Sequence, residues 1–293
     1  MERFVQVLVD GLADGSVYAA LALALALVYR TTGIVNFAQG EMAMFSAFAV
    51  WGLTRGGVAL GLAVPFVIAG SFVAGMALER VAIRPLERRD TLSIVIATFG
   101  LSILLNSVAG MIWGTETYAF PSLFGGDVTE LLGVHLGVDA LATAGLLILV
   151  LALLWLLFER TRVGLAMRAA AVDPAAATLM GVRVGRTLML GWGLAAAVGA
   201  LAGVLVAPDL FLDVHMMAGV LIYALAAVCL GGFDSPFGAV IGGWIVGIAQ
   251  SLTTAYVDFI GTELSVLVPF TVILLVLLVR PQGLFGTRAV VRA

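Results

Sequence analysis

Apolar runs long enough to cross a lipid bilayer recur along this whole chain. A membrane-spanning helix needs about 20 mostly apolar residues, because every backbone polar group must be bonded inside the helix. The pattern predicts an all-α, polytopic transmembrane helical bundle of eight or nine spans in a single transmembrane domain, residues 1–293. The runs cover residues 4–29, 60–78, 91–115, 140–158, 187–208, 214–233, 235–257 and 264–279, and a shorter one covers 42–54.

Composition excludes a soluble protein. Apolar residues make up 62% of the 293 residues and charged residues 11%, and the mean hydropathy is +1.15. Soluble domains carry roughly 25% charged residues, so lipid must surround most of this surface. The net charge of −3 and the lack of a basic patch argue against a nucleic-acid partner. The run at 4–29 is too long for a cleavable signal and is expected to be the first span.

The reactive residue types are few. All 15 basic residues are arginine, which excludes a P-loop lysine and Schiff-base chemistry. The single Cys229 lies in an apolar run, so neither a disulfide nor a cysteine metal site is expected. His135 and His215 have no second ligand at metal-binding spacing. We therefore expect neither ATP hydrolysis by a P-loop nor a metal site in this chain.

The arginines predict the orientation. Twelve of the 15 lie in segments 79–90, 159–186 and 280–292, whereas segments 114–139, 208–216 and 257–263 hold eight carboxylates and no arginine. Arginine-rich segments normally face the cytoplasm. We therefore expect a multi-pass protein of the cell inner (plasma) membrane with a cytoplasmic C-terminus. The N-terminus lies outside if 42–54 spans fully, and inside if it does not.

The stretch 31–41 breaks the lipid pattern, because Asn36, Gln39 and Glu41 stand between two apolar runs. Polar groups survive at membrane depth only where they face protein or a water-filled path. A broken helix is one recurrent way to build a transport site, in which case these three residues line the translocation pathway. A short cytoplasmic turn, with Asn36 as a helix cap, explains the same residues.

Two further patterns lie on helix faces. Asp10 and Asp14 are four residues apart in the first span, which indicates either a pore-facing stripe or interfacial solvation. Glycines spaced by four predict close contacts between helices. These pairs are Gly11/Gly15, Gly199/Gly203, Gly238/Gly242 and Gly243/Gly247.

The segment 159–186 contains helix signals in a position predicted to be cytoplasmic. Asp173 followed by Pro174 starts a helix, and Gly181 ends it. A short alanine-rich helix at about 174–180 is therefore expected, either as a docking surface for another protein or as a simple connector. In the first case, the residues that couple the chain to a partner are Arg168, Asp173, Ala175, Ala176, Leu179 and Gly181.

These pieces resemble the branched-chain amino acid ABC transporter permeases, and most of all the H-type subunits of the high-affinity leucine/isoleucine/valine systems. The similarity lies in residues 15–19, in residues 33–41 (Gly-Ile-Val-Asn-Phe-Ala-Gln-Gly-Glu), in the coupling loop at 164–181, in the glycine-rich element at 231–243 and in the ending 280–286. It covers essentially the whole chain in the same order.

The resemblance implies a permease domain that translocates branched-chain or related amino acids without activity of its own. Its partners would be a second related permease subunit, two cytoplasmic ATPase subunits that use the ATP, and an extracytoplasmic solute-binding protein, with membrane lipid around it. Similar permeases take urea or short amides, so the solute stays open. A self-sufficient secondary carrier or channel is the alternative from another class, but the long runs after residue 90 lack the buried ionisable residues that ion coupling commonly needs.

Overall fold

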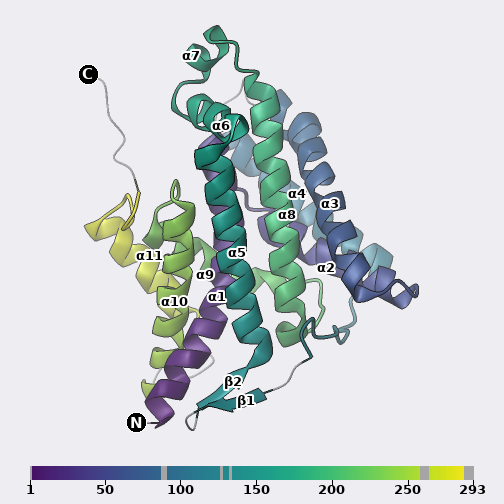
Figure 1. The fold of residues 1–293 in the computed structure, drawn as a ribbon, viewed down its shortest axis with the longest axis vertical. Helices are drawn as coiled ribbons and strands as arrows, with labels where there is room; N and C mark the ends of the chain where they lie inside the picture. The colour runs from purple at the N-terminus through teal and green to yellow at the C-terminus, as the bar shows by residue number, and fades with distance from the viewer. Residues whose placement is uncertain (1, 87–90, 126–127, 132–133, 258–263, 287–293) are drawn as a thin grey trace. The chain divides into compact units, whose positions relative to one another are not determined.

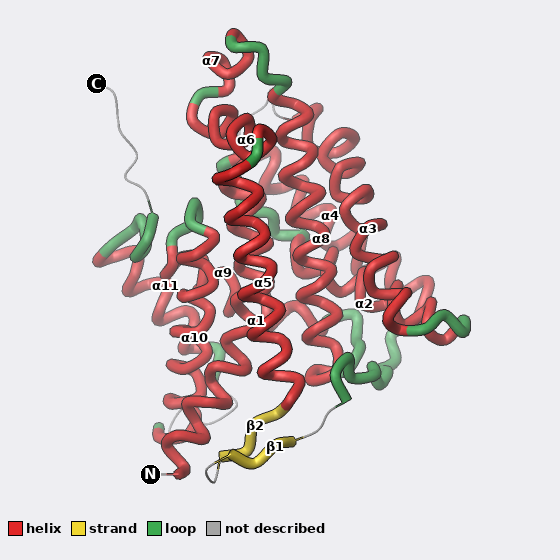
Figure 2. The backbone as a smooth tube through the Cα atoms, in the orientation of Figure 1, coloured by secondary structure: helices red, strands yellow, loops and turns green. Residues whose placement is uncertain are grey.

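Helix is the main element of the described part of the chain. The computed structural model describes residues 2–86, 91–125, 128–131, 134–257 and 264–286, and Figure 2 shows how far helix dominates them. Beyond the helices, the described part contains an antiparallel hairpin of β1 (Val128–Leu131) and β2 (Val134–Gly137). The helices are α1 (Glu2–Thr32), α2 (Gln39–Arg55), α3 (Leu60–Leu78), α4 (Thr91–Trp113), α5 (Val138–Arg160), α6 (Arg162–Val172), α7 (Pro174–Leu179), α8 (Val184–Leu210), α9 (Met216–Gly231), α10 (Pro236–Tyr256) and α11 (Leu267–Val279).

Six of these helices are long and apolar enough to cross a membrane. They are Arg3–Thr32, Leu60–Leu86, Leu92–Trp113, Val138–Arg160, Val184–Leu210 and Pro236–Tyr256. The shorter apolar helices α9 and α11 match two of the remaining predicted runs, and α2 matches the run at 42–54. The chain is thus a helical, multi-pass membrane protein. The predicted total of eight or nine spans depends on these three shorter helices and stays a prediction.

The contacts divide the chain into two compact units. Unit 1 contains Met1–Ala26, Phe124–Leu147 and Gly219–Ala293, and unit 2 contains Leu27–Leu123 and Ile148–Ala218. Three helices, α1, α5 and α9, pass from one unit into the other.

In unit 2 the helices α2 and α3 pack on α8, as Figure 1 shows. The contacts are close because glycine removes the side chain at each crossing. A Cβ on Gly75 of α3 would lie 2.6 Å from the Trp192 carbonyl oxygen of α8. A Cβ on Gly203 of α8 would collide with the backbone of Ala43 of α2. Gly203, one of the predicted spaced glycines, therefore lies at a helix contact.

In unit 1 the glycine pairs of α1 and α10 face each other. A Cβ on Gly15 would lie 2.8 Å from the Trp244 Cα, and one on Gly243 would lie 2.6 Å from the Ala19 Cα. Gly247 packs directly on the backbone of Gly11 and Gly15. The glycines spaced by four thus lie at a close helix contact, as predicted, and the structure identifies α1 and α10 as the two helices that meet.

Two sequence elements far apart in the chain also meet in unit 1. The Leu284 amide donates to the Leu230 carbonyl at 2.8 Å, and the Phe285 amide donates to the Gly231 carbonyl at 3.0 Å. Gly232, with φ 107°, permits this approach, since a residue with a side chain rarely adopts that angle. The ending at 280–286 therefore folds back onto the turn between α9 and α10.

Candidate functional site

The polar stretch between α1 and α2 lies beside the N-terminal half of α8. Thr31, in the last turn of α1, lies against Gly191 of α8. Gln39, the first residue of α2, donates its side-chain amide to the Ala195 carbonyl at 3.0 Å. Both positions fall within α8 (Val184–Leu210), itself long enough to span the membrane. The break between the two helices is therefore level with a spanning segment and does not lie beyond its end.

Asn36 organises this break. Its side-chain carbonyl accepts from the Ala38 amide at 3.0 Å, and its side-chain amide donates to the Gln39 side-chain oxygen at 3.0 Å. Asn36 and Gln39 are both 0% exposed. A buried amide without partners would be costly, and here each amide is satisfied by protein. In this conformation the two residues fix the start of α2 and do not reach solvent.

Helix α4 closes the break from another side. The Phe37 amide donates to the Thr98 hydroxyl at 3.4 Å, and the Phe37 and Phe99 rings stack with centroids 4.4 Å apart. Thr98 is 0% exposed. Asn36, Gln39 and Thr98 together thus hold the loop through three helices, α2, α8 and α4.

Glu41 differs from these residues because it is partly exposed. Its carboxylate accepts from the Asn106 side-chain amide at 3.3 Å, and the same amide donates to the Val214 carbonyl at 2.6 Å. Asn106 is also partly exposed. The pair presents a carboxylate and an amide at accessible positions within the spanning region of α4, where a polar solute can form hydrogen bonds.

A cavity of about 430 Å³ adjoins the start of the break. One side is formed by the end of α1 and the first loop residues, and the other by the segment that carries α6 and α7. Its lining includes Thr31, Gly33, Ile34, Ile83, Ala170 and Pro174. The break and the predicted coupling segment thus border one space in unit 2.

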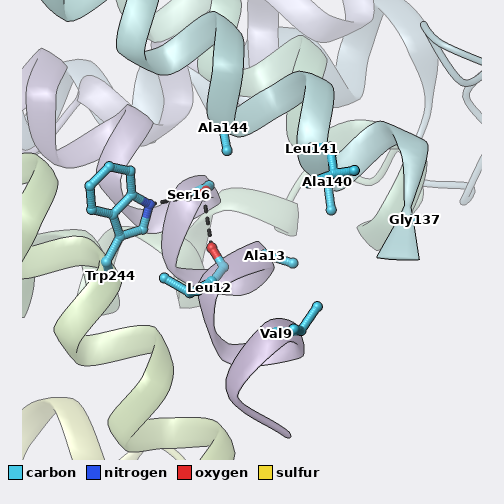
Figure 3. A pocket seen from close by; sticks show the side chains of 9 residues that line it. All are labelled: Val9, Leu12, Ala13, Ser16, Gly137, Ala140, Leu141, Ala144 and Trp244. Atoms are coloured by element: carbon cyan, nitrogen blue, oxygen red, sulfur yellow. Dashed lines mark hydrogen bonds between the residues drawn. The ribbon is translucent and has the colours of Figure 1, made fainter. Parts of the chain in front are cut away.

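A second cavity, of about 280 Å³, lies in unit 1 among α1, α10 and the start of α5 (Figure 3). Its lining is almost entirely apolar. The Trp244 indole donates to the Ser16 hydroxyl at 3.0 Å, and that hydroxyl donates to the Leu12 carbonyl at 2.8 Å. These polar groups are therefore engaged by protein. None of the predicted pathway residues lines this cavity.

The predicted coupling segment forms the expected short helix. The Asp173 carboxylate caps α7 by accepting from the Ala176 amide at 2.9 Å. Gly181 has φ 84°, and the bonds from the Gly181 amide to the Thr178 carbonyl and from the Val182 amide to the Ala177 carbonyl end the helix. The start and stop signals in the sequence are thus confirmed. Figure 1 places α6 and α7 at the N-terminal end of α8.

This segment exposes large apolar side chains. Leu179 is 91% exposed, Val172 is 87% exposed and Met180 is 73% exposed. Ala175 is also exposed, and Ala176 is partly exposed. Contiguous exposed apolar residues of this kind mark interaction surfaces.

Arg168 is engaged within the segment. Its guanidinium forms an ion pair with Glu159 at 2.7 Å, and both side chains are about one third exposed, at 34% and 39%. The pair connects α6 to the last turn of α5. Arg168 therefore holds the two helices together in this conformation, while its predicted contact with a partner stays a prediction.

Sequence reasoning missed several polar residues. Thr98 and Asn106 lie inside the run at 91–115. The signal that could have found them is that both are polar in a mostly apolar span. In unit 1 the Tyr18 hydroxyl donates to the Gln250 side-chain oxygen at 2.6 Å, and the Tyr18 and Tyr223 rings stack at 4.5 Å. Asp10 accepts from Gln6 at 2.8 Å on the exposed face of α1, an arrangement compatible with both a pore-facing stripe and interfacial solvation.

Comparison with known proteins gives a consistent result over nearly the whole chain. The family model described as "Branched-chain amino acid transport system / permease component" matches residues 7–277. The chain is 35% identical over 301 positions to the high-affinity branched-chain amino acid transport system permease protein LivH of Escherichia coli (strain K12), covering 97% of this chain and 96% of that protein. It is 31% identical to the corresponding permease protein BraD of Pseudomonas aeruginosa, with the same coverage of 97% and 96%.

More distant similarity extends to an archaeal protein and to a solved structure. The chain is 29% identical to the probable branched-chain amino acid transport permease protein LivH of Methanocaldococcus jannaschii, over 91% of this chain and 87% of that protein. The solved structure "PsaBC from Streptococcus pneumoniae in complex with Fab" aligns with a TM-score of 0.50 and 14% identity, covering 93% of this chain and 91% of that one. This last similarity is one of fold alone.

Proposed function

Because the chain belongs to the branched-chain amino acid transport system permease family, we propose that it is the membrane-spanning permease subunit of an ATP-binding-cassette importer for branched-chain amino acids. The observation that carries the proposal is the family match over residues 7–277. The polar break beside α8 supports it, because a permease needs polar groups at membrane depth. Glu41 and Asn106 supply such groups at partly exposed positions.

The energy for uptake comes from partner subunits in this proposal. The chain has no lysine, so it lacks the residue that a P-loop places on the nucleotide phosphates. Two ATPase subunits bind and hydrolyse ATP, a second related permease subunit completes the membrane part, and a solute-binding protein delivers the amino acid. The permease itself requires no cofactor.

The exposed apolar residues of α6 and α7 form the docking surface for an ATPase subunit. Leu179, Met180 and Val172 are the most exposed large side chains of this segment. Burial of a leucine side chain contributes about 1.5–3 kcal/mol, so a cleft that covers Leu179 gains a substantial part of its affinity there. The cap at Asp173 and the stop at Gly181 keep α7 rigid, which allows it to transmit force.

The orientation in the inner membrane follows from the arginines. Segment 159–186 holds five of them and carries α6 and α7, so the docking surface lies in the cytoplasm by the positive-inside rule. The arginines at 280–292 support a cytoplasmic C-terminus by the same rule; residues 287–293 lie outside the described part, as do 87–90 and 258–263. This orientation brings the docking surface to the side where ATP is available.

In this proposal the translocation pathway passes the break between α1 and α2. Glu41 and Asn106 face the solute directly, while Asn36 and Gln39 hold the start of α2 in place and reach the pathway only when the importer changes conformation. The Glu41 carboxylate suits the ammonium group that all amino acids share, and the Asn106 amide, which donates to Glu41 and to the Val214 carbonyl, holds that carboxylate in place. The binding protein provides most of the selectivity for the branched side chain.

The test is reconstitution of the complete importer in proteoliposomes with each subunit omitted in turn. We expect uptake of leucine, isoleucine and valine only when the permease pair, the ATPases and the binding protein are all present. Uptake of urea or acetamide in place of these amino acids would contradict the proposed substrate. Leucine uptake by this chain alone would contradict the role as a subunit.

A further inference from the structure

A charged pair lies at the end of α3, where that helix passes into a π-helical turn, Glu79–Ile83, and a 3-10 turn, Arg84–Leu86. The Glu79 carboxylate accepts from the Arg84 guanidinium at 2.9, 3.1 and 3.2 Å. Glu79 is 0% exposed and the Arg84 side chain is 31% exposed. Single π-helical turns occur frequently at functional sites.

Arg84 has a second partner on a different helix. Its guanidinium donates to the Gly185 carbonyl, which belongs to the first turn of α8. A Cβ on Gly185 would lie 3.2 Å from the Arg84 guanidinium carbon, so the guanidinium fills the space that glycine leaves open. One side chain thus joins the end of α3 to the start of α8.

The docking segment, meaning α6 and α7, joins the membrane part of the chain at the start of α8. Only four residues, 180–183, separate α7 from α8, and α6, α7 and the π-helical turn all contact α8. A displacement of α7 therefore moves the first turn of α8, and the Arg84 bonds carry that movement to α3.

A cavity borders the bridge on one side. About 430 Å³ of space separates Ala170 and Pro174 of the docking segment from Thr31 and Gly33 at the break. Atoms on the two sides of this void have no contact, so a displacement of the segment that carries α6 and α7 reaches the membrane part through α8. The Glu79–Arg84–Gly185 bridge lies at the edge of this space, through Ile83 and Val184.

We propose that Arg84 is a positioning residue for energy coupling: it ties the start of α8 to Glu79 of α3, so that movement of the docked α7 displaces α3. The inference rests on the proposed function, since it needs the ATPase subunits. It predicts that loss of the bridge separates ATP hydrolysis from transport while the importer still assembles. A merely structural bridge would instead lower the amount of folded permease.

The test compares Arg84→Gln with Arg80→Gln in the complete importer in proteoliposomes. Both variants remove one positive charge from the same short segment, but Arg80 is exposed. The measurement is the ratio of ATP hydrolysis with and without loaded binding protein, together with leucine uptake. We expect Arg84→Gln to reduce this ratio towards one and to lower uptake by roughly tenfold or more, and Arg80→Gln to behave as wild type.

A second variant keeps the charges of both Glu79 and Arg84 and provides a test if the first variant misfolds. Gly185→Val pushes the guanidinium away from α8 and is expected to reduce the stimulation ratio in the same way. If the Arg84→Gln permease does not accumulate in the membrane, the stimulation ratio of the Gly185→Val importer tests the inference in its place.

The outcomes separate this inference from the proposed function. Wild-type stimulation retained in well-assembled Arg84→Gln and Gly185→Val importers would overturn the inference alone. A wild-type importer that shows no stimulation by loaded binding protein would overturn the proposed function and the inference together.

Discussion

Gln39 donates its side-chain amide to the carbonyl oxygen of Ala195, 3.0 Å away and part-way along α8. The first residue of α2 is therefore bonded to the backbone of a helix that spans the membrane. Both residues are buried, with Gln39 at 0% and Ala195 at 1% exposure. The first amides of a helix have no hydrogen-bond partner within that helix. At this depth water cannot supply acceptors, and the side chains of the break supply part of them.

Replacement of Gln39 by leucine should abolish most uptake. Gln39→Leu leaves the buried Asn36 amide with only the Met42 sulfur, a weak acceptor 3.6 Å away, in place of the Gln39 oxygen, at a cost of about 1–3 kcal/mol. The start of α2 then shifts, and we expect leucine uptake to fall by roughly tenfold at normal membrane levels of the protein. Gln6→Leu, the same change on the exposed face of α1, is the matched control and should transport normally. Normal uptake by Gln39→Leu would show that the amide does not position α2.

Cysteine labelling should separate the two kinds of polar residue in the break. In a Cys229→Ala background, Glu41→Cys should react with a water-soluble maleimide, because Glu41 is partly exposed. Asn36→Cys and Gln39→Cys should react far more slowly, because both positions are 0% exposed. Equal labelling at all three positions in the resting importer would contradict the assigned burial and indicate that the whole stretch lines an open path.

Sequence patterns anticipated those features that depend on local chemistry. Asp173 and Gly181 bound α7 as predicted, because capping depends on residues within one turn. Glycines spaced by four lie at close helix contacts as predicted, but the pairing of Gly15 with Gly247 came only from the structure. The stretch at 31–41 was identified as unusual, but its place beside Ala195 was not predictable, since a turn at the membrane surface has the same local sequence.

The contacts that sequence could not supply join residues far apart in the chain. The Arg84 bond to Gly185 spans 101 positions and the Asn106 bond to Val214 spans 108. Neither has a periodic signature, and Arg84 was read only as part of an arginine-rich segment. Thr98 and Asn106 were not singled out from the apolar run at 91–115, and their partners depend on how α4 packs.

The docking surface should depend on the apolar tip of α7. Leu179→Glu places a charge on a leucine that is 91% exposed in the free chain and that the proposed ATPase contact would cover, so uptake and solute-stimulated ATP hydrolysis should fall together. Ala176→Glu should act in the same way. Leu179→Met is the conservative control and should keep both activities.

The cap of α7 allows a graded version of this test. Asp173→Ala removes the acceptor of the Ala176 amide and should cost about 1 kcal/mol of helix stability, giving a milder loss than Leu179→Glu. Wild-type uptake and stimulation in both Leu179→Glu and Ala176→Glu would place the docking surface elsewhere in the chain.

The contact between α1 and α10 should be sensitive to a single methyl group. Gly247→Ala places a Cβ directly against the backbone of Gly11 and Gly15, and the resulting overlap should destabilise the protein by about 1–3 kcal/mol. Gly145→Ala is the matched control, because a Cβ there meets nothing within 4 Å and alanine favours the helix. Thermal unfolding in detergent should show a lower midpoint for Gly247→Ala only. Equal midpoints would mean that α1 and α10 separate easily.

The source of energy distinguishes an ATP-driven permease subunit from a self-sufficient carrier. The most direct measurement is leucine accumulation in proteoliposomes that contain the complete importer and a saturating amount of binding protein. One set receives ATP on the side of the ATPases without any ion gradient, and the other receives a proton or sodium gradient without ATP. We predict accumulation above equilibrium in the first set only. Accumulation driven by an ion gradient without ATP would contradict the assignment of this chain as a permease subunit powered by its partners.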